Sequence, residues 1–457
     1  MGIAASLFFS TSDPENCLDY RIRPSVEQET AQTERWNDLR DFLLGELQTL
    51  SGYSMSSWLQ GSYKFGTQIR PAKPTQEFDI DLGVYYRWSG EPEDGAHYPE
   101  DLKAFVQDRL RAYADDEEND AEEVTDPKER CSRIRFNDSF HIDVPAYHLD
   151  ATRDARALAT ETKGWEESDP KAIYVWWKEK FDDADRPRAR RLVRYLKMWA
   201  ALKFDEAKRP SSILLTVLLA NALAEIDADN LVGDDEFLHA CSSEMLRVLR
   251  RSMTVWNPVN ANENLNLNRL DATAAKEFLN SLEAFVATST RAISATTKPD
   301  SAEIWSEIFE HFFPMTDEVA TDARTGALVV AQFDPIVKVE VKKGDGRQIF
   351  TNAVVSIPKG CELTFCLDNA LHLPLGAEVF WTVRNTGEAE TFNDLGHTKR
   401  GPNVVENSVY RGTHYMDVQV RLNGRTIGRK RVPVQITGLG LPLRNPPRPA
   451  YANHRFR

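Results

Sequence analysis

The sequence predicts an α+β protein with at least two domains. Its 457 residues exceed what one compact core usually holds, because domains average about 150 residues. The first third of the chain contains both strand-like alternation of apolar and polar residues and the periodicity of amphipathic helices. The next part has helical periodicity alone. The last part has short strand-like segments separated by Gly, Asn and Pro. Hydrophobic residues at 41% and charged residues at 28% are near globular averages, which excludes a largely disordered or collagen-like chain.

The first part of the chain is expected to form a sheet with helices packed on it. Residues 27–50 repeat apolar side chains at steps of three and four, as an amphipathic helix does. Residues 77–87 and 133–148 alternate apolar and polar side chains, as half-buried strands do, and a second helix is expected near 99–114. The acidic run at 115–126 is expected to be a solvated loop.

The rest of the chain divides into regions with different residue patterns. Periodic runs predict an all-helical lobe, and the short strands after it predict a β-sandwich followed by a flexible, Pro-rich, basic tail. The expected boundaries are 1–164 for the N-terminal helix and sheet lobe, 165–328 for the helical lobe, 329–440 for the β-rich domain and 441–457 for the tail.

Charge and composition limit the classes of partner that the protein is expected to bind. Residues 333–457 hold 18 Lys and Arg against 11 Asp and Glu, a net +7, which leaves −21 for residues 1–332. An acidic first unit argues against long nucleic acids, whose binding needs many cations. Five scattered cysteines without a CxxC make zinc or a disulfide framework unexpected. With no stretch of about 20 apolar residues and no basic leader, we expect a cytoplasmic protein without a membrane partner.

Three aspartates are the strongest chemical signal. Asp79 and Asp81 stand two residues apart on a predicted strand, so they share one face. If the strand carrying Asp143 pairs beside it, a third carboxylate joins them. Three anions this close are tolerable mainly when divalent cations neutralise them. Hard oxygen ligands favour Mg²⁺ or Mn²⁺.

A glycine-serine turn supplies the complementary half. Gly61 allows close backbone approach, and exposed N–H groups together with the Ser62 hydroxyl can cradle phosphate oxygens. A carboxylate trio beside a phosphate cradle indicates nucleoside triphosphate chemistry. In a two-metal arrangement one ion activates a hydroxyl and the other stabilises the pyrophosphate leaving group. Asp143 would bind the first ion and could accept the hydroxyl proton.

These motifs resemble a known family. The order QGSYKFGTQIRP, FDIDLGV and HIDVPAYH resembles the cGAS/DncV-like nucleotidyltransferases (CD-NTases, also called SMODS nucleotidyltransferases) of bacterial CBASS antiphage systems, within the polymerase-β-like superfamily. The resemblance covers most of residues 25–325 and implies a bilobed core. It implies that Asp79, Asp81 and Asp143 are the catalytic residues and metal ligands. It also places Gln60, Gly61 and Ser62 at the donor nucleotide.

Two later segments extend the resemblance. Arg190, Arg194 and Lys197 form a basic stripe on a predicted helix, which by itself is typical of a solvated face. Its position resembles the family's spine lysine, so Lys197 is expected to contact the triphosphate. Ser211 and Ser212 begin the next helix, where an ordinary N-cap is an equal alternative to a phosphate contact. The resemblance implies a phosphate-binding serine here and leaves open which one.

The flanking histidines and the C-terminal domain have competing interpretations. His141 and His148 flank the third aspartate, and structural roles are expected for both. The β-rich region resembles the adenylyl/guanylyl cyclase and SMODS C-terminal sensor domain, proposed to bind nucleotides. Trp381 could stack on a base, or could belong to the sandwich core. The candidate cationic partners for phosphate are Lys399, Arg400, Arg411 and His414.

The resemblance implies an enzyme that links NTPs, ATP and GTP being expected, into a cyclic oligonucleotide messenger. A purine cyclic dinucleotide such as a cGAMP is expected, made with two Mg²⁺ ions (Mn²⁺ as a substitute) and acting on a separate effector protein in antiphage defence. One alternative is transfer of a nucleotide to an RNA end, a protein or a small acceptor. A second is a catalytically silent nucleotide-binding sensor or scaffold.

Overall fold

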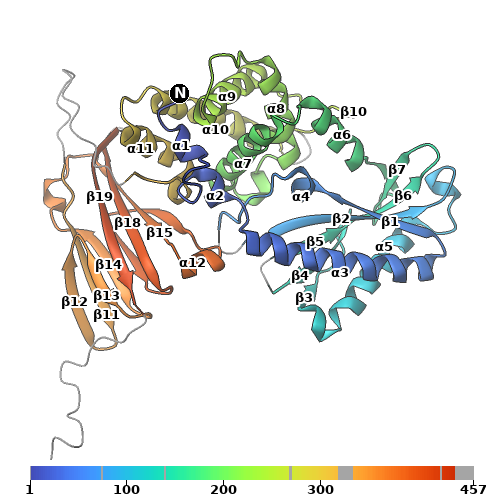
Figure 1. Cartoon of the computed structure of the whole chain (residues 1–457), viewed down its shortest axis with the longest axis horizontal. Helices are drawn as coiled ribbons and strands as arrows, with labels where there is room; N and C mark the ends of the chain where they lie inside the picture. The colour runs from blue at the N-terminus through green and yellow to red at the C-terminus, as the bar shows by residue number, and fades with distance from the viewer. Residues whose placement is uncertain are drawn as a thin grey trace, which may run out of the picture. The chain divides into compact units, whose positions relative to one another are not determined.

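The chain forms two compact units that divide near residue 320. The computed structural model describes residues 2–73, 76–137, 140–266, 270–316, 333–422 and 425–437. The predicted tail at 441–457 lies outside the described residues. Figure 1 shows the elements of both units, and each unit is described by itself.

The first unit contains a mixed sheet centred on β2 (Phe78–Arg87). β2 runs antiparallel to β1 (Ser54–Gln60) and parallel to β5 (Phe140–Val144) and then β6 (Ala146–Asp150), with a break at Pro145. Proline has no N–H for a ladder, which explains a break there. The remaining strands of this sheet are β3 (Ala121–Val124), β4 (Ser132–Phe136), β7 (Ala155–Ala159) and β8 (Trp165–Glu167).

Two helices cover one face of this sheet. α3 (Val26–Ser51) begins with a capping box between Ser25 and Gln28 and ends at Gly52, whose φ is 74°. α5 (Pro99–Ala114) packs beside it, and Figure 1 shows both helices alongside the strands. Their apolar faces and the inward side chains of β2 form one core. Both helices match the predicted ranges to within one residue.

The acidic run at 115–126 is only partly the solvated loop that was predicted. It contains a 3₁₀ turn at Glu117–Asn119 and then β3, the edge strand of the sheet. Glu122 and Glu123 are exposed, and the Glu123 carboxylate accepts from Arg135 Nη1 at 2.7 Å. Charged side chains on a sheet edge discourage further strand pairing, which is how so acidic a segment can belong to a sheet.

The helical lobe predicted after the sheet is confirmed, but it begins at Pro170 and not at residue 165, which lies in β8 of the sheet. Two further differences occur. A small hairpin of β9 (Trp256–Asn257) and β10 (Asn260–Asn264) interrupts it. The N-terminal helices α1 (Ala5–Phe8) and α2 (Leu18–Ile22) pack on it. The lobe's own helices are α6 (Pro170–Lys180), α7 (Arg186–Lys203), α8 (Ser212–Glu225), α9 (Asp234–Arg251), α10 (Ala272–Ile293) and α11 (Lys298–Phe309).

The second unit is β-rich, as predicted, and its two sheets share one hydrophobic core. One sheet has the order β12-β11-β14-β17 and the other β13-β19-β18-β15-β16. A short helix, α12 (Glu388–Thr391), accompanies the strands. The strands are β11 (Val337–Lys343), β12 (Gly346–Thr351), β13 (Val354–Ile357), β14 (Glu362–Leu367), β15 (Glu378–Arg384), β16 (Gly396–Arg400), β17 (Asn403–Asn407), β18 (Gly412–Leu422) and β19 (Arg425–Ile436).

Trp381 belongs to the sandwich core and does not form a stacking surface. Its side chain is fully buried, and its indole Nε1 donates to the Gly401 carbonyl at 2.9 Å. Lys399 and Arg400 on the neighbouring strand pair with Glu406 and Glu378. The core interpretation of Trp381 is therefore confirmed. A nucleotide stacked on this indole is not compatible with the structure.

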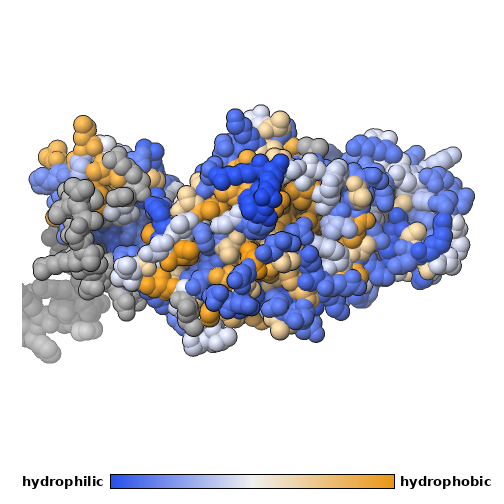
Figure 2. Space-filling view, turned by 90° about the horizontal axis from the view of Figure 1, so that it is seen from above, coloured by the Kyte–Doolittle hydropathy of each residue, from blue (hydrophilic) through white to orange (hydrophobic). Residues whose placement is uncertain are grey.

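The surface of the molecule is mostly hydrophilic on the face shown in Figure 2, with apolar residues in separate patches. Scattered apolar residues are normal on a protein surface. Among the helices that the structure describes, none is both long and apolar enough to cross a membrane.

Candidate active site

The three predicted aspartates lie on one face of two adjacent parallel strands. In the register of β2 and β5, Asp79 is opposite His141 and Asp81 is opposite Asp143. Their neighbours along the strands are buried apolar residues, because side chains alternate between the two faces of a sheet. The strand that carries Asp143 therefore does pair with the strand that carries Asp79 and Asp81, as the predicted trio of carboxylates required.

Asp79, His141 and Asp143 each offer a ligand atom, and these atoms lie within 4.8 Å of one another. Asp81 projects from the same face toward the turn after β1. Its Oδ2 lies 1.9 Å from where a Cβ on Gly61 would stand. Burial, and then the charges of Asp79 and Asp143, raise the pKa of Asp81 well above its usual value.

Two cations already face Asp143. Arg133, opposite it on β4, donates from Nε and Nη2 to the two carboxylate oxygens at 2.5 and 2.8 Å. Lys128 Nζ lies 3.4 Å from Oδ2. Burial would raise the pKa of Asp143, but the Arg133 hydrogen bonds outweigh it and hold the pKa below its usual value. Part of the charge that the sequence assigned to metal ions is therefore balanced by these side chains.

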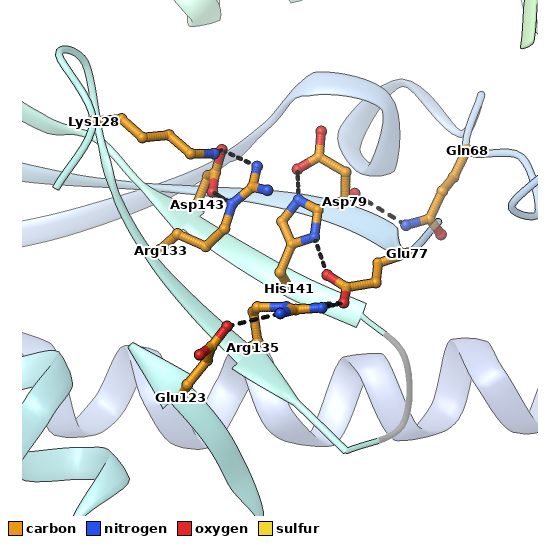
Figure 3. Close-up of polar contacts among 9 residues, drawn as sticks. All are labelled: Gln68, Glu77, Asp79, Glu123, Lys128, Arg133, Arg135, His141 and Asp143. Atoms are coloured by element: carbon orange, nitrogen blue, oxygen red, sulfur yellow. Dashed lines mark hydrogen bonds and ion pairs between the residues drawn. The ribbon is translucent and has the colours of Figure 1, made fainter. Parts of the chain in front are cut away.

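His141 lies in the acidic cluster, at a position for which the sequence analysis expected a structural role. Its Nδ1 lies 2.9 Å from Glu77 Oε2 and its Nε2 lies 3.0 Å from Asp79 Oδ1. Figure 3 shows the imidazole between these carboxylates and Arg135 bound to Glu77. His148 conforms to the structural expectation, because it is buried and bonded to the Trp88 carbonyl at 3.1 Å. The sequence signal for His141 was its position two residues before Asp143 on a strand.

A cleft of about 950 Å³ opens beside this cluster. It is lined by both lobes of the first unit, and a cavity of this size can hold a nucleotide. The predicted residues that line it are Ser62, Asp79, Lys197, Ser211 and Ser212.

Lys197 is the one member of the predicted basic stripe that lines the cleft. It is buried, and its Nζ donates to the Thr67 carbonyl at 2.8 Å. Burial lowers the pKa of Lys197 to about 8, against the opposing charge of Asp79. Arg194, in contrast, pairs with Asp19 of α2. One residue of the stripe faces the cleft and another ties two helices together.

The two serines at the start of α8 differ. Ser211 is the N-cap, and its Oγ accepts from the Leu214 N–H at 3.2 Å. Ser212 is the first helical residue, and its side chain is exposed at the cleft. The N-cap interpretation therefore describes Ser211. Ser212 is the more exposed residue of the two.

The structure does not bring the Gln60 side chain into the cleft. Gln60 is buried, its Nε2 donates to the Tyr85 hydroxyl, and its Oε1 accepts from the Tyr147 hydroxyl, both at 3.2 Å. Gly61 begins the short helix α4 (Gly61–Phe65) with a φ of 56°. A contact of Gln60 with a nucleotide would have to use its backbone.

Several basic side chains in the cleft were missed by the sequence reasoning. They come from segments that are far apart in the sequence, and only the fold brings them together. No regular spacing in the sequence predicts that they share a site. Together they offset the acidic balance of the first unit at this one place. The cleft-lining cations beyond Lys197 are Arg70, Lys128, Arg133, Arg135 and Arg209.

Comparison with known families gives two matches. Residues 56–147 match the family described as cyclic GMP-AMP synthase DncV-like, nucleotidyltransferase domain. Residues 308–437 match the adenylyl/guanylyl and SMODS C-terminal sensor domain. The first match contains the glycine-serine turn and all three aspartates, and the second contains the β-rich unit.

Relatives and solved structures agree with these matches. A cyclic GMP-AMP synthase of Escherichia albertii is 29% identical over 445 residues, covering 94% of this chain and 95% of the relative. A c-di-GMP synthase of Roseivirga ehrenbergii is 24% identical over 177 residues, covering 36% and 44%. The GTP-bound structure of Vibrio cholerae DncV superimposes with a TM-score of 0.58 at 18% identity, covering 68% of this chain and 96% of that one. The structural likeness establishes the fold.

Proposed function

We propose that this chain, a homologue of the cyclic GMP-AMP synthases with a DncV-like nucleotidyltransferase domain and a C-terminal sensor-type domain, joins nucleoside triphosphates into a cyclic dinucleotide and releases pyrophosphate. The observation that carries the proposal is the convergence of acid and phosphate-binding groups in one cleft. Asp79 lines this cleft together with Ser62 and Lys197, and Asp81 and Asp143 project from the same sheet face as Asp79.

The acidic cluster fits a divalent cation. The ligand atoms of Asp79, His141 and Asp143 lie close enough for one ion, and carboxylate oxygens are the ligands that Mg²⁺ and Mn²⁺ prefer. We propose two Mg²⁺ ions held by Asp79, Asp81 and Asp143. Such ions would polarise the α-phosphate, activate the attacking hydroxyl and stabilise the leaving pyrophosphate.

The side chains around the cluster have distinct proposed tasks. Lys197 and Ser212 would bind the donor's phosphate oxygens, with the buried ammonium acting in a site of lowered dielectric. The acceptor hydroxyl would release its proton to water, its oxygen would bond to the α-phosphorus, and the bond from that phosphorus to pyrophosphate would break. The lowered pKa of Asp143 makes it a weak proton acceptor. We therefore assign it an ion-holding role in preference to that of general base.

A second transfer would close the ring. One structural relative, Vibrio cholerae DncV, is described in complex with the linear intermediate 5′ pppA(3′,5′)pG. We propose the same sequence here: ATP and GTP give a linear dinucleotide, which turns in the cleft so that its own triphosphate becomes the donor. The product would act on a separate effector protein in antiphage defence.

The test is product analysis of the full chain incubated with ATP, GTP and Mg²⁺. We expect a phosphatase-resistant product with the mass of a cyclic dinucleotide. The paired substitutions Asp79→Ala and Asp81→Ala should abolish it, while Asp41→Ala, an exposed aspartate on α3, should leave it unchanged. Only phosphatase-sensitive chains, a nucleotide attached to protein or RNA, or no turnover at all would contradict the proposal.

A further inference from the structure

We propose that the Nε2 atom of His141 is itself a ligand of a divalent cation in this site, beside the carboxylates of Asp79 and Asp143. The inference rests on the proposed function, because it concerns the ion that serves the same reaction. It adds an imidazole to a set that the sequence described as all oxygen. Four observations support it.

The first observation places a ring proton of His141 on Nδ1, the nitrogen that is not the proposed ligand. His141 Nδ1 lies 2.9 Å from Glu77 Oε2. Glu77 is held as a carboxylate by Arg135, which donates from Nε at 2.9 Å. A carboxylate only accepts, so Nδ1 is the donor. In a neutral ring Nε2 then carries a lone pair.

The second observation is that Nε2 is buried without a hydrogen bond. His141 is only 7% exposed, and among the described residues its Nε2 has no hydrogen-bond partner. It lies 3.0 Å from Asp79 Oδ1 but does not meet hydrogen-bond geometry with it. Buried polar atoms almost always have a partner, so this one needs an explanation.

The third observation is the spacing. Two ligands on adjacent positions of an octahedral ion, each at about 2.1 Å, lie about 3 Å apart. That is the distance between Nε2 and Asp79 Oδ1, which is 3.0 Å. A ligand atom of Asp143 falls within 4.8 Å of both. A cation bound by both atoms would explain two lone-pair-bearing atoms at this separation.

The fourth observation is the support behind the ring. Metal-binding histidines nearly always donate their second nitrogen to a carboxylate, a backbone carbonyl or water, which fixes the tautomer and the ring orientation. Glu77 has that position here, and Arg135, which also binds Glu123, holds Glu77. Figure 3 shows the chain of contacts from Glu123 through Arg135, Glu77 and His141 to Asp79. A histidine that only filled space would not need this series of partners.

The competing interpretation is a protonated His141 that bridges Glu77 and Asp79 and only positions Asp79. The two differ in whether nitrogen touches the metal. Pulsed electron paramagnetic resonance of Mn²⁺ bound to the full-length chain measures this directly. We expect the coupling of one directly bound imidazole ¹⁴N, replaced by a ¹⁵N coupling in protein labelled at histidine. Bound Mn²⁺ without nitrogen coupling in the unmodified chain would overturn the proposal, and this measurement needs no variant to fold.

Variants sharpen the test. His141→Asn should remove the nitrogen coupling and weaken Mn²⁺ binding at least as much as loss of a supporting residue, for which the usual factor is about 10- to 100-fold. Glu77→Gln should keep the coupling and weaken binding by that factor. His97→Asn is the matched control, because His97 belongs to the same unit and bonds to the Ser51 carbonyl. A folded His141→Asn that binds Mn²⁺ as tightly as the unmodified chain would refute the assignment.

The two proposals can fail separately. A chain that makes cyclic product while its Mn²⁺ shows no nitrogen coupling contradicts only the histidine ligand. Nitrogen coupling in a chain that makes no product supports the ligand and contradicts the function.

Discussion

The Arg133 guanidinium on β4 donates two hydrogen bonds to the Asp143 carboxylate on the antiparallel strand β5, from Nε at 2.5 Å and from Nη2 at 2.8 Å. Both side chains are largely shielded from solvent, at 23% and 13% exposure. Such bidentate pairs are among the stronger polar contacts in proteins. Asp143 is therefore held in place and kept ionised before any metal ion binds.

Removing this guanidinium should cost stability, and a cation should restore part of it. Arg133→Met leaves the largely shielded Asp143 carboxylate without its bidentate partner, and Lys128, at 3.4 Å, stays as a more distant cation. We expect the free energy of unfolding to fall by about 1–3 kcal/mol in EDTA. Because Mg²⁺ can take the place of the lost charge, the deficit should shrink when Mg²⁺ is added. Urea unfolding with and without Mg²⁺ measures both values.

The matched control is the double variant Arg133→Met with Asp143→Asn. It removes the uncompensated carboxylate, so it should be more stable in EDTA than Arg133→Met alone. Mg²⁺ should restore less stability to it. An Arg133→Met chain that is as stable as the unmodified one would show that the ion pair contributes nothing.

Asp81→Asn should stabilise the ion-free protein while abolishing synthesis. Burial and the charges of Asp79 and Asp143 raise the pKa of Asp81, so its ionised form is disfavoured in the folded state. A carboxyl with a raised folded pKa loses stability as pH rises through that pKa. The advantage of Asp81→Asn in thermal unfolding with EDTA should therefore be larger at pH 8 than at pH 5. An advantage that grew at low pH would contradict this account.

The sequence located the acids because their signal is local. Asp79 and Asp81 lie two residues apart on a strand, so their shared face follows from the geometry of one strand. The position of Asp143 depended on strand pairing, which the alternation around it suggested and the register confirms. Helices α3 and α5 were predictable for the same reason, because their periodicity and caps lie within the segment.

Contacts between distant segments could not be predicted. Arg133 and His141 are informative only once β4, β5 and β2 are adjacent. The stripe on α7 illustrates the limit, since helical spacing groups Arg190, Arg194 and Lys197, yet Arg194 binds Asp19 of α2. The edge strand β3 was missed because its acidic composition opposes strand formation, and pairing with β4 overrides that preference.

Lys197 predicts a loss of activity at alkaline pH. Burial lowers its pKa to about 8, and a lysine is charged only below its pKa. We expect kcat/KM for the nucleotide to fall as pH rises through about 8, mainly through a higher KM, because phosphate binding loses its cation. Lys197→Arg should move the decline to higher pH if the larger side chain is accommodated, and Lys197→Met should lower kcat/KM at every pH. A flat profile to pH 9.5 with unchanged KM would exclude this role.

Gly61→Ala should damage both the fold and the reaction, whereas Gly45→Ala should do neither. A Cβ on residue 61 would stand 1.9 Å from Asp81 Oδ2, and the φ of 56° is one that side-chain-bearing residues rarely adopt. Backbone strain of this kind costs about 1–3 kcal/mol, and relieving the clash means moving a proposed metal ligand, so synthesis should fall with it. Gly45 lies within α3 with nothing within 4 Å of its Cβ position, so alanine there should raise stability by about 0.5–1 kcal/mol through helix propensity. Chemical unfolding and product assays on both variants compare the two glycines, and a fully active Gly61→Ala would mean that Asp81 need not stay where the structure places it.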